Sequence, residues 1–257
     1  MTGKLMTFLV RVFGPPRVEL TEAYADLPAG RPFDHSVYDQ LVTQHVDSDG
    51  FVDYPGLRRN QAALDQYLDA LGSVALDELG RDERLALLLN AYNAFTLRLI
   101  LDHFPVKSIR KIPAAKRWKA KRWRLGQQLH SLDEIEHEMI RPNFREPRIH
   151  FALVCAAVGC PPLRAEAYTG ERLEAQLQDQ MRVAHASPRW IRYQRGRSTI
   201  ALTPLYLWYA GDFEQVAGSV LAFVALHHDD LAADLAAGHR PSIQHLHYDW
   251  SLNRQRP

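Results

Sequence analysis

Both cysteines of the chain and one of its histidines lie within a single stretch of sixteen residues, RIHFALVCAAVGCPPL at 148–163. The three residues are His150, Cys155 and Cys160. A cysteine attacks a carbonyl carbon as its thiolate, so it needs a histidine within hydrogen-bond reach and partial exposure to solvent. A third group, a carboxylate or an amide, has to hold the imidazole in the correct tautomer. The stretch therefore offers a nucleophile and a base, and the third group has to come from elsewhere.

Two segments before this stretch supply candidates for the remaining groups. Glu136 and His137 are adjacent in one segment, and Asn90 and Asn93 lie three positions apart in the other. Either asparagine could orient the base or donate a hydrogen bond to a developing oxyanion. The competing interpretation is that both tie neighbouring loops to the core, because buried amides need hydrogen-bond partners.

The choice of cysteine depends on the local backbone. If 149–155 is one extended strand, His150 and Cys155 point to opposite faces and lie roughly 16 Å apart, so they cannot form a dyad. Cys155 alternates with apolar residues and is predicted to be a small buried hydrophobe. Cys160 follows Gly159 and precedes two prolines, which suits a partly exposed thiol on a stiff loop. We favour Cys160 as the nucleophile and keep Cys155 as the alternative.

The choice of histidine stays open. His137 is expected in the middle of a helix, and Cys160 reaches His150 only if the intervening loop doubles back. Glu136 diverges from its neighbour by ~100° on a helix, which makes it a better partner for His150 or for a buried arginine such as Arg148. A hydrogen-bonded structural role is the competing interpretation for each histidine.

The periodicity of apolar residues places these groups on a series of helices followed by short strands. The sequence Ser-Leu-Asp-Glu is a capping box that starts a helix at Ser131. The stretch 149–155 is apolar at both alternating sets of positions, as in a strand covered on two faces. Helices are expected at 35–45, 57–71, 81–103, 131–144, 170–187 and 216–227, a hairpin at 190–202, and irregular segments at 1–32 and 240–257. This order predicts an α+β fold in which a helical N-terminal half packs on a small, mainly antiparallel sheet.

Composition bounds the class of protein. With 257 residues, 46% hydrophobic and 24% charged, the chain is large enough for a well-buried core, and we expect one domain over 33–257 after the irregular leader. A net charge of +1 excludes a global polyelectrolyte role and gives no strong signal for nucleic acid. Two cysteines cannot make a disulfide framework, but they could make one bridge or remain free thiols. Free thiols are expected in a reducing compartment, and we predict a cytoplasmic location.

The N-terminus and the basic segment are the two places where a surface could bind a membrane or an anion. Arg11 interrupts the apolar run 5–13, so we expect a tail or docking segment there, with a membrane-surface anchor or an export signal as alternatives. No later segment approaches the ~20 apolar residues of a spanning helix. The segment 107–124 combines basic residues with two tryptophans, which fits an anion-binding face or a solvated surface loop. The anion-binding candidates are Lys119, Lys121 and Arg122.

Four pieces of the sequence resemble the family called domain of unknown function 547. They are FDHSVYDQLVTQHVDSDGFVDYPGL at 33–57, LNAYNAFTLRLIL at 89–101, SLDEIEHEMIRPNF at 131–144 and PRIHFALVCAAVGCPPLRAEAYT at 147–169. With the spacing between them they cover about 33–215, which is most of the chain. The N-terminus departs from the family, because many relatives look exported and this chain has no convincing leader.

The resemblance implies an α+β fold similar to those of papain-like and transglutaminase-like thiol enzymes, with cleavage of γ-glutamyl amide bonds in some members. The motif positions that carry over are Asn90, Asn93, Glu136, His137, His150, Cys155 and Cys160. The resemblance implies a small peptide or another amide-containing molecule as substrate, and it leaves the oligomeric state open.

Three functions compete at this point. The first is a papain-like cysteine hydrolase or acyltransferase acting on an amide or isopeptide bond. The second is a structural zinc site made by Cys155, Cys160, His137 and His150, although the Cys-x4-Cys spacing is longer than the common one. The third is a non-catalytic module that binds an anion through segment 107–124. Nucleotide-binding and serine-hydrolase motifs are absent, so no cofactor is predicted.

Overall fold

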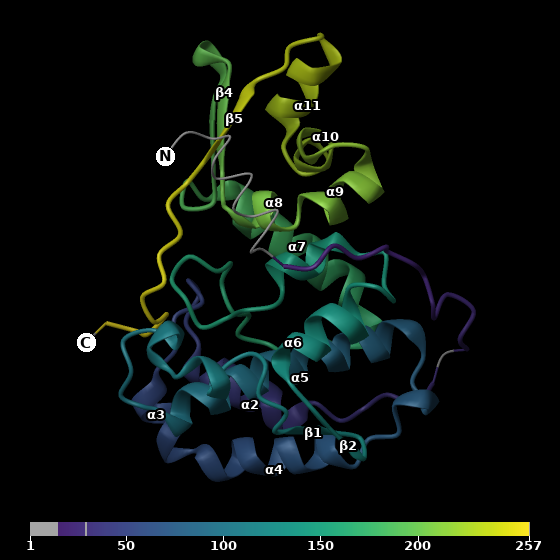
Figure 1. Cartoon of the computed structure of the whole chain (residues 1–257), viewed down its shortest axis with the longest axis vertical. Helices are drawn as coiled ribbons and strands as arrows, with labels where there is room; N and C mark the ends of the chain where they lie inside the picture. Colours follow the sequence, from purple (N-terminus) through teal and green to yellow (C-terminus); the bar gives the residue numbers. More distant parts are fainter. Residues whose placement is uncertain (1–14, 29, 257) are drawn as a thin grey trace.

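A single long helix forms the centre of the computed structural model, which describes residues 15–28 and 30–256 (Figure 1). This helix, α5 (Arg81–Asp102), begins after Gly80 with Asp82 and Glu83 in its first turn, where acidic groups favour the positive end of the helix dipole. It is long and apolar enough to cross a membrane, but 89% of its apolar window is buried inside the protein. The prediction of a buried core helix at 81–103 is confirmed.

The N-terminal helices lie along α5 at one end of the molecule (Figure 1). Helix α2 (Ser36–His45) confirms the prediction for 35–45. The single helix expected at 57–71 is two helices, α3 (Tyr54–Arg59) and α4 (Gln61–Gly72), which meet at Asn60. A 3-10 turn, η1 (Leu76–Glu78), connects α4 to the central helix.

The basic segment is mostly irregular and ends in a small hairpin. It contains two 3-10 turns, η2 (Ile109–Lys111) and η3 (Ala114–Lys116), before strands β1 (Trp123–Leu125) and β2 (Gln128–His130) pair antiparallel. The capping box at Ser131 is confirmed: its hydroxyl accepts from the Glu134 N–H, and the Glu134 carboxylate accepts from the Ser131 N–H. Helix α6 (Leu132–Glu134) continues directly into a π-helix, η4 (Ile135–Ile140).

The strand predicted at 149–155 is wrong. The chain forms a 3-10 helix, η5 (Pro147–Phe151), in which Glu146 accepts a hydrogen bond from the Arg148 N–H at the start. The following loop pairs its main chain with side chains and with its own preceding turn, and no second strand lies beside it among the described residues. Apolar residues on every side fit a short buried helix as well as a covered strand. The geometric separation of His150 from Cys155 inferred from a strand therefore does not apply.

The C-terminal third contains a second sheet and four short helices. After η6 (Gly170–Arg172), helix α7 (Leu173–Ala186) confirms the prediction for 170–187. Strands β3 (Ile191–Gln194) and β4 (Thr199–Leu202) form the predicted hairpin around the 3-10 turn η7 (Arg195–Arg197). The helices are α8 (Leu205–Trp208), α9 (Ala210–Ala217), α10 (Val220–Ala225) and α11 (Asp229–Ala236). The helix expected at 216–227 is thus divided between α9 and α10, because Gly218 ends α9 in a left-handed conformation.

The final segment is more ordered than the irregular tail predicted for 240–257. Strand β5 (Ser242–His245) adds to β4 in parallel, which makes the second sheet mixed. The chain then returns to the N-terminal helices (Figure 1), where Leu252 bridges Ala157 and Arg254 bridges Val52. This return brings residues far apart in sequence against the loop that carries the cysteines.

The architecture is mixed α+β, with many helices and two small sheets. The three-stranded sheet lies at the opposite end of the molecule from α2, α3 and α4 (Figure 1). Of the expected packing of the N-terminal helices on a sheet, the described residues show only that of α4 against β1 of the two-stranded antiparallel sheet. The described part of the leader, 15–28 and 30–32, has no helix or strand, in agreement with prediction. Its apolar run at 5–13 lies outside the described residues.

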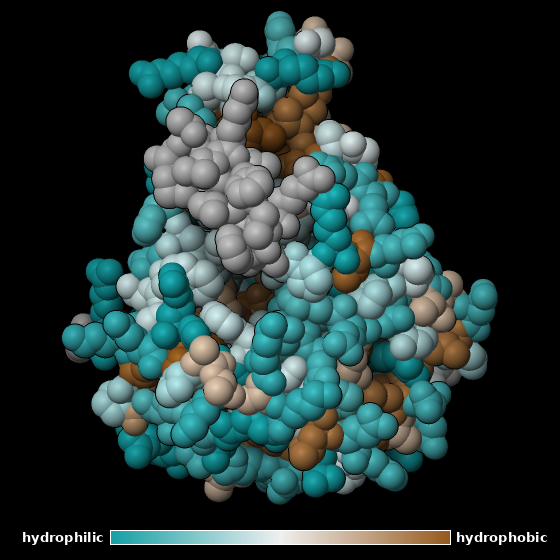
Figure 2. Space-filling model, in the orientation of Figure 1, coloured by the Kyte–Doolittle hydropathy of each residue, from teal (hydrophilic) through white to brown (hydrophobic). Residues whose placement is uncertain are grey.

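The surface is mainly hydrophilic on the face shown in Figure 2. On the face shown in Figure 2, hydrophilic side chains predominate and hydrophobic ones form small separate groups, one of them between the three-stranded sheet and α11. This pattern fits the net charge of +1 and a protein whose apolar residues are mainly internal.

Candidate active site

The two thiols touch each other. The sulfur atoms of Cys155 and Cys160 lie 2.8 Å apart, and both cysteines are free. The main-chain N–H of Cys155 donates to the Cys160 sulfur at 3.2 Å. The hydroxyl of Tyr248 lies 3.0 Å from the Cys160 sulfur and 3.3 Å from the Cys155 sulfur. We call Cys155 and Cys160 together the thiol pair.

The thiol loop, residues 155–160, is held by the returning C-terminal segment. The N–H groups of Val158 and Gly159 donate to the carbonyls of Ser251 and Asp249. A Cβ at Gly159 would lie 2.9 Å from the Asp249 nitrogen and 2.9 Å from the Tyr248 ring, so only glycine allows this approach. Ala156 adopts a left-handed φ of 58°, which turns the chain sharply between the cysteines. The loop is therefore shaped to bring Tyr248 onto both sulfurs.

The exposure of the two cysteines is the reverse of the prediction. Cys155, expected to be a buried hydrophobe, is only partly buried, whereas Cys160, expected to be presented on the loop, is 4% exposed. The reason is that the two prolines after Cys160 enter the core instead of the surface. A molecule arriving from solvent meets Cys155 first.

The negative charge of the pair rests on Cys160. Burial by itself raises the pKa of the Cys160 thiol, but hydrogen bonds from the Cys155 thiol, Tyr248 and main-chain N–H groups outweigh it and lower the pKa to about 7. The Cys155 pKa is raised well above its usual range, first by its hydrogen bond to Cys160 and then by burial. Burial also keeps the pKa of Tyr248 well above 10, so its hydroxyl remains a donor. Near neutral pH the pair therefore shares one proton over two sulfurs.

A second group of polar side chains surrounds Asp212, which lies on α9. Its Oδ2 lies 2.8 Å from the Nε2 of His150 and its two carboxylate oxygens each lie 2.8 Å from a nitrogen of Arg141. All three residues are 3% exposed or less. Burial alone would raise the pKa of Asp212, but the hydrogen bonds from His150 and Arg141 lower it to about 2.

The charges in this group fix the tautomer of the histidine. Asp212 is ionised and its charge is matched by Arg141, so burial dominates at His150 and lowers the imidazole pKa. The neutral ring must donate from Nε2, because an ionised carboxylate only accepts. Nδ1 is then the unprotonated nitrogen of His150, and no hydrogen bond to it forms within the described part of the chain.

His137 and Glu136 occupy the rim of the same group. The Nδ1 of His137 accepts from Arg141 at 3.1 Å, so the lone pair of this nitrogen is already engaged. The Glu136 carboxylate accepts from the Tyr209 hydroxyl at 2.5 Å, and the Tyr209 ring stacks on His150 with centroids 3.7 Å apart. Glu136 bonds neither of the two partners named for it, because Asp212 holds His150, and Glu146 and Glu174 hold Arg148. Its charge does act on a buried arginine, Arg141.

Arg148 forms its ion pairs elsewhere. Its guanidinium binds Glu146 and Glu174, and both contacts raise the Arg148 pKa against the opposing effect of burial. These partners hold η5 to the start of α7. Arg148 is therefore a structural residue of the segment that carries His150.

The thiols and the imidazole of His150 do not touch each other. Across residues 15–28 and 30–256, no hydrogen bond joins a sulfur to a histidine ring. The Glu136 carboxylate nevertheless acts on both: its charge opposes the lowering of the His150 pKa by burial, and it adds to the raising of the Cys155 pKa by Cys160 and by burial. Glu136 thus lies within electrostatic reach of the thiol pair and of the imidazole.

Asn90 and Asn93 hold loops in place. The amide of Asn93 donates to the Ala152 carbonyl and accepts from the Val154 N–H, both at 2.9 Å. The amide of Asn90 pairs in the same way with both main-chain groups of Tyr168. Neither contacts an imidazole or a sulfur, so the structure places both in the supporting role.

The four proposed zinc ligands do not come together in one cluster, although the two cysteines touch. No cluster of three or more His, Cys, Asp or Glu side chains with the geometry to hold a metal ion occurs in the described ranges. The thiol pair instead satisfies its hydrogen bonds with Tyr248. The site fits no metal among these residues.

The basic segment is partly neutralised. Lys121 forms an ion pair with Glu134, and Arg122 forms one with Asp102. Lys119 is exposed. Two of the three residues predicted to bind an anion are therefore engaged by carboxylates of the chain itself.

Aromatic side chains lead from this segment to the thiols. Tyr248 packs on Trp208 and Trp250, with ring centroids 4.8 and 4.6 Å apart, and Trp118 lies 6.2 Å from Trp250. The guanidinium of Arg110 lies 5.2 Å from the centre of the Trp250 ring. We call Trp118, Trp208, Tyr248 and Trp250 the aromatic cluster. Its three tryptophans are only partly buried, so they form a surface beside the thiol pair.

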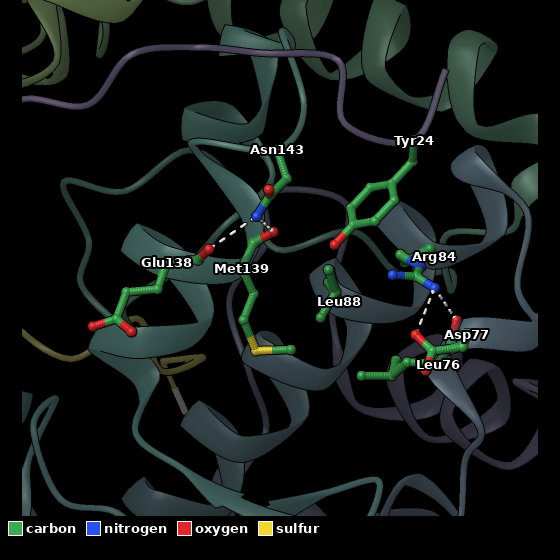
Figure 3. Close-up of a pocket in the computed structure, with 8 residues that line it drawn as sticks. All are labelled: Tyr24, Leu76, Asp77, Arg84, Leu88, Glu138, Met139 and Asn143. Carbon is green, nitrogen blue, oxygen red and sulfur yellow. Dashed lines mark hydrogen bonds and ion pairs between the residues drawn. The ribbon is translucent and has the colours of Figure 1, made fainter. Parts of the chain in front are cut away.

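A separate pocket of about 260 Å³ lies between Tyr24, Leu88, Met139 and Asn143 (Figure 3). Its polar groups are largely paired, with Asn143 bonded to the carbonyls of Glu138 and Met139. None of its lining residues belongs to the thiol pair or to the Asp212 group. The pocket is therefore not the site of thiol chemistry.

Sequence reasoning missed Asp212, Arg141, Tyr209 and Tyr248. Asp212 lies 62 positions from His150, and Tyr248 lies 88 positions from Cys160. No local sequence pattern signals contacts between residues so far apart. Arg141 had a signal, since it follows His137 by one helical turn within the segment that carries Glu136.

Comparison with known proteins agrees with the sequence motifs in part. Residues 76–183 match the model of the family described as "Protein of unknown function, DUF547". Every catalytic candidate named from the sequence lies within this DUF547 domain, whereas Tyr209, Asp212 and Tyr248 follow it. No curated protein and no solved structure matches the chain.

Proposed function

We propose that the DUF547 domain of this chain and the segment that follows it form a cysteine hydrolase or acyltransferase acting on an amide or isopeptide bond. The observation that carries the proposal is the thiol pair, in which a partly exposed cysteine touches a second sulfur whose pKa is about 7. A thiolate available at neutral pH is what a nucleophilic cysteine requires. The proposed chemistry is that of papain-like thiol enzymes, with a sulfur in place of the usual imidazole as first proton acceptor.

Acylation starts with transfer of a proton across the pair. Cys155 passes its proton to the Cys160 thiolate over the 2.8 Å contact, and the Cys155 thiolate, nearer to solvent, attacks the carbonyl carbon. A sulfur–carbon bond forms and the carbon–nitrogen bond breaks. The Cys160 thiol returns its proton to the leaving amine, so the pair ends with Cys160 again ionised.

Deacylation needs a base for the attacking nucleophile. The neutral Nδ1 of His150 has its lone pair directed away from Asp212 and is the ring nitrogen suited to accept this proton. Water or an amine then attacks the thioester, and the Cys155 sulfur leaves as a thiolate. The proton held by His150 passes to this thiolate, so the pair again shares one proton over two sulfurs. Asp212 and Arg141 act as positioning residues that keep the imidazole neutral and in one tautomer.

The substrate side of the proposal rests on the aromatic cluster. Its partly buried tryptophans provide an apolar surface for the acyl part of a small peptide, with Arg110 at the outer end for a carboxylate. A γ-glutamyl amide carries both an acyl chain and a free carboxylate, and is the first substrate class to test. Because free thiols persist in reducing surroundings, the enzyme would work in a compartment such as the cytoplasm.

The test combines labelling with turnover. Iodoacetamide would be titrated across pH 5 to 9 with mass spectrometry of each cysteine, and cleavage of a panel of γ-glutamyl and other isopeptides would be followed in parallel. We expect the rate of Cys155 alkylation to rise with pH, with its midpoint near pH 7, because the thiol pair loses its first proton from Cys160 at about that pH. Cys155→Ser should abolish turnover, and Cys160→Ser should move the alkylation midpoint upward.

The chain provides a clean background, because it contains only two cysteines. Full turnover of the panel by Cys155→Ser would refute the proposal. Arg145→Ala, an exposed charge outside the site, serves as the matched surface control.

A further inference from the structure

We infer that Cys155 and Cys160 are a redox-active dithiol that reacts with disulfides and closes to an intramolecular disulfide. The inference does not rest on the proposed acyl transfer, because it concerns a different bond and a different class of substrate. It would hold equally if the chain cleaved no amide at all.

The first support is proximity. The two sulfurs lie 2.8 Å apart, so a disulfide, with its bond of about 2.05 Å, needs an approach of about 0.8 Å. Side-chain rotation supplies movements of this size without unfolding the loop. No other cysteine exists in the chain to compete for either sulfur.

The second support is the division of roles between the cysteines. Cys155 is partly exposed and can meet an incoming disulfide, while Cys160 is 4% exposed and therefore shielded from one. An exposed attacking thiol and a shielded second thiol are the arrangement in which a mixed disulfide is resolved internally. The Tyr248 hydroxyl bonds to both sulfurs and can follow the negative charge from one to the other.

The third support is the backbone of the thiol loop. Ala156 holds a left-handed conformation although it is not a glycine. The loop is fixed by main-chain hydrogen bonds from Val158 and Gly159 to 251 and 249, and by one from the Asn253 N–H to the Ala156 carbonyl. The surrounding structure thus keeps the sulfurs together in the reduced protein. Closing a ring between groups already in contact costs little conformational entropy.

The reaction balances without any further reagent. The Cys155 thiolate, after passing its proton to Cys160, attacks one sulfur of a small disulfide RS–SR, and one RS⁻ leaves and takes up a proton from water. The Cys160 sulfur then gives up its proton, attacks the Cys155 sulfur and releases the second RS⁻. The dithiol is oxidised by two electrons and the external disulfide is reduced to two thiols.

The test uses the full chain and glutathione disulfide as the probe. Intact mass spectrometry after equilibration in glutathione buffers of graded ratio should show one species that has lost two hydrogen atoms and carries no glutathione. Its fraction should follow the buffer ratio reversibly. Peptide mapping should place the link between Cys155 and Cys160.

Single variants separate the two roles. Cys160→Ser should retain glutathione on Cys155 as a stable mixed disulfide, because the resolving sulfur is missing. Cys155→Ser should react at least tenfold more slowly, because the remaining thiol is shielded. A wild-type protein that keeps stable glutathione adducts, or that does not react at all, would overturn the inference. Circular dichroism of each variant shows whether it is folded, and an unreactive wild-type protein counts against the inference whatever the variants do.

Discussion

The Nε2 of His150 lies 2.8 Å from the Oδ2 of Asp212, in surroundings where the two side chains are 1% and 3% exposed. The same carboxylate is bound through both oxygens by Arg141. One buried anion is therefore shared by a permanent cation and a neutral imidazole. This arrangement keeps Asp212 ionised, while burial keeps His150 uncharged.

Asp212→Asn should destabilise the fold strongly. The variant leaves the buried Arg141 guanidinium without its counter-charge, and removing one partner of a buried ion pair costs about 3–5 kcal/mol. Urea unfolding followed by circular dichroism measures the change. The double variant Asp212→Asn/Arg141→Met should recover part of the loss, because it no longer buries an unpaired charge. A loss below about 1 kcal/mol in the single variant would contradict this account.

Acid should unfold the wild type through the same carboxylate. The folded-state pKa of Asp212 is lowered from 3.8 to about 2, so this residue stabilises the fold above pH 4, and the contribution disappears as the pH falls from 4 towards 2. The shift corresponds to roughly 2 kcal/mol of unfolding free energy. Urea unfolding at several pH values in this window measures it. The slope of unfolding free energy against pH should become shallower in Asp212→Asn. An unchanged slope would show that Asp212 does not cause the loss of stability in this pH window.

Tyr248→Phe should raise the pKa of the thiol pair. The phenylalanine ring keeps the packing against Trp208 and Trp250 but cannot donate to the sulfurs. Loss of one donor to a thiolate shifts its pKa upward by roughly one unit. The pH dependence of alkylation gives the value. Tyr193→Phe, at the other end of the molecule beside Asp234, is the matched control and should leave the midpoint where it is.

His150→Asn should separate the two steps of the proposed reaction. Asparagine can still donate to Asp212 but cannot take a proton, so acylation of Cys155 should persist while deacylation slows. With an amide that the wild-type protein cleaves, rapid-quench intact mass spectrometry should show the acyl-enzyme accumulating in the variant. Steady-state turnover should fall about 10²–10⁴-fold. Equal loss of both steps would show that His150 acts on the thiols instead. Circular dichroism checks that the variant is folded.

Several features of the fold are readable from local sequence. The capping box at Ser131, the apolar stretch of α5 and the strand preferences either side of Gly196 each specify structure within a few residues, and each prediction is confirmed. The strand prediction for 149–155 failed because a segment covered on all sides is apolar throughout, so its sequence has no periodicity that distinguishes a helix from a strand. Its conformation is set by Asn93, more than fifty positions earlier, whose amide takes the main-chain groups that a neighbouring strand would need.

The site was predictable only in its residue types. Cysteine, histidine and glutamate were recognised as a chemical set, and the structure places them near one another. Which thiol meets solvent depends on how the loop folds under Tyr248, and which carboxylate holds His150 depends on a helix 62 positions away. Such contacts are made by the tertiary fold, so neither spacing nor periodicity carries them.

Gly159→Ala tests whether the close approach of the C-terminal segment sets the chemistry of the thiols. Gly159 has an ordinary φ, so alanine adds no backbone strain, but its Cβ would lie 2.9 Å from the Asp249 nitrogen and from the Tyr248 ring. The segment must move outward, which lengthens or breaks the bonds from the Tyr248 hydroxyl to both sulfurs. We expect a loss of about 1–3 kcal/mol in stability and an alkylation midpoint shifted upward as in Tyr248→Phe.

The matched control for this variant is Gly211→Ala. Gly211 lies in α9, and nothing stands within 4 Å of an added Cβ, so the same chemical change meets open space. Its stability should be unchanged or higher by up to about 1 kcal/mol, because alanine favours helix over glycine. If Gly159→Ala matched this control in both stability and thiol titration, the C-terminal segment would not be what lowers the pKa of Cys160. The Cys155 thiol and the main-chain N–H groups of the loop would be left as the cause.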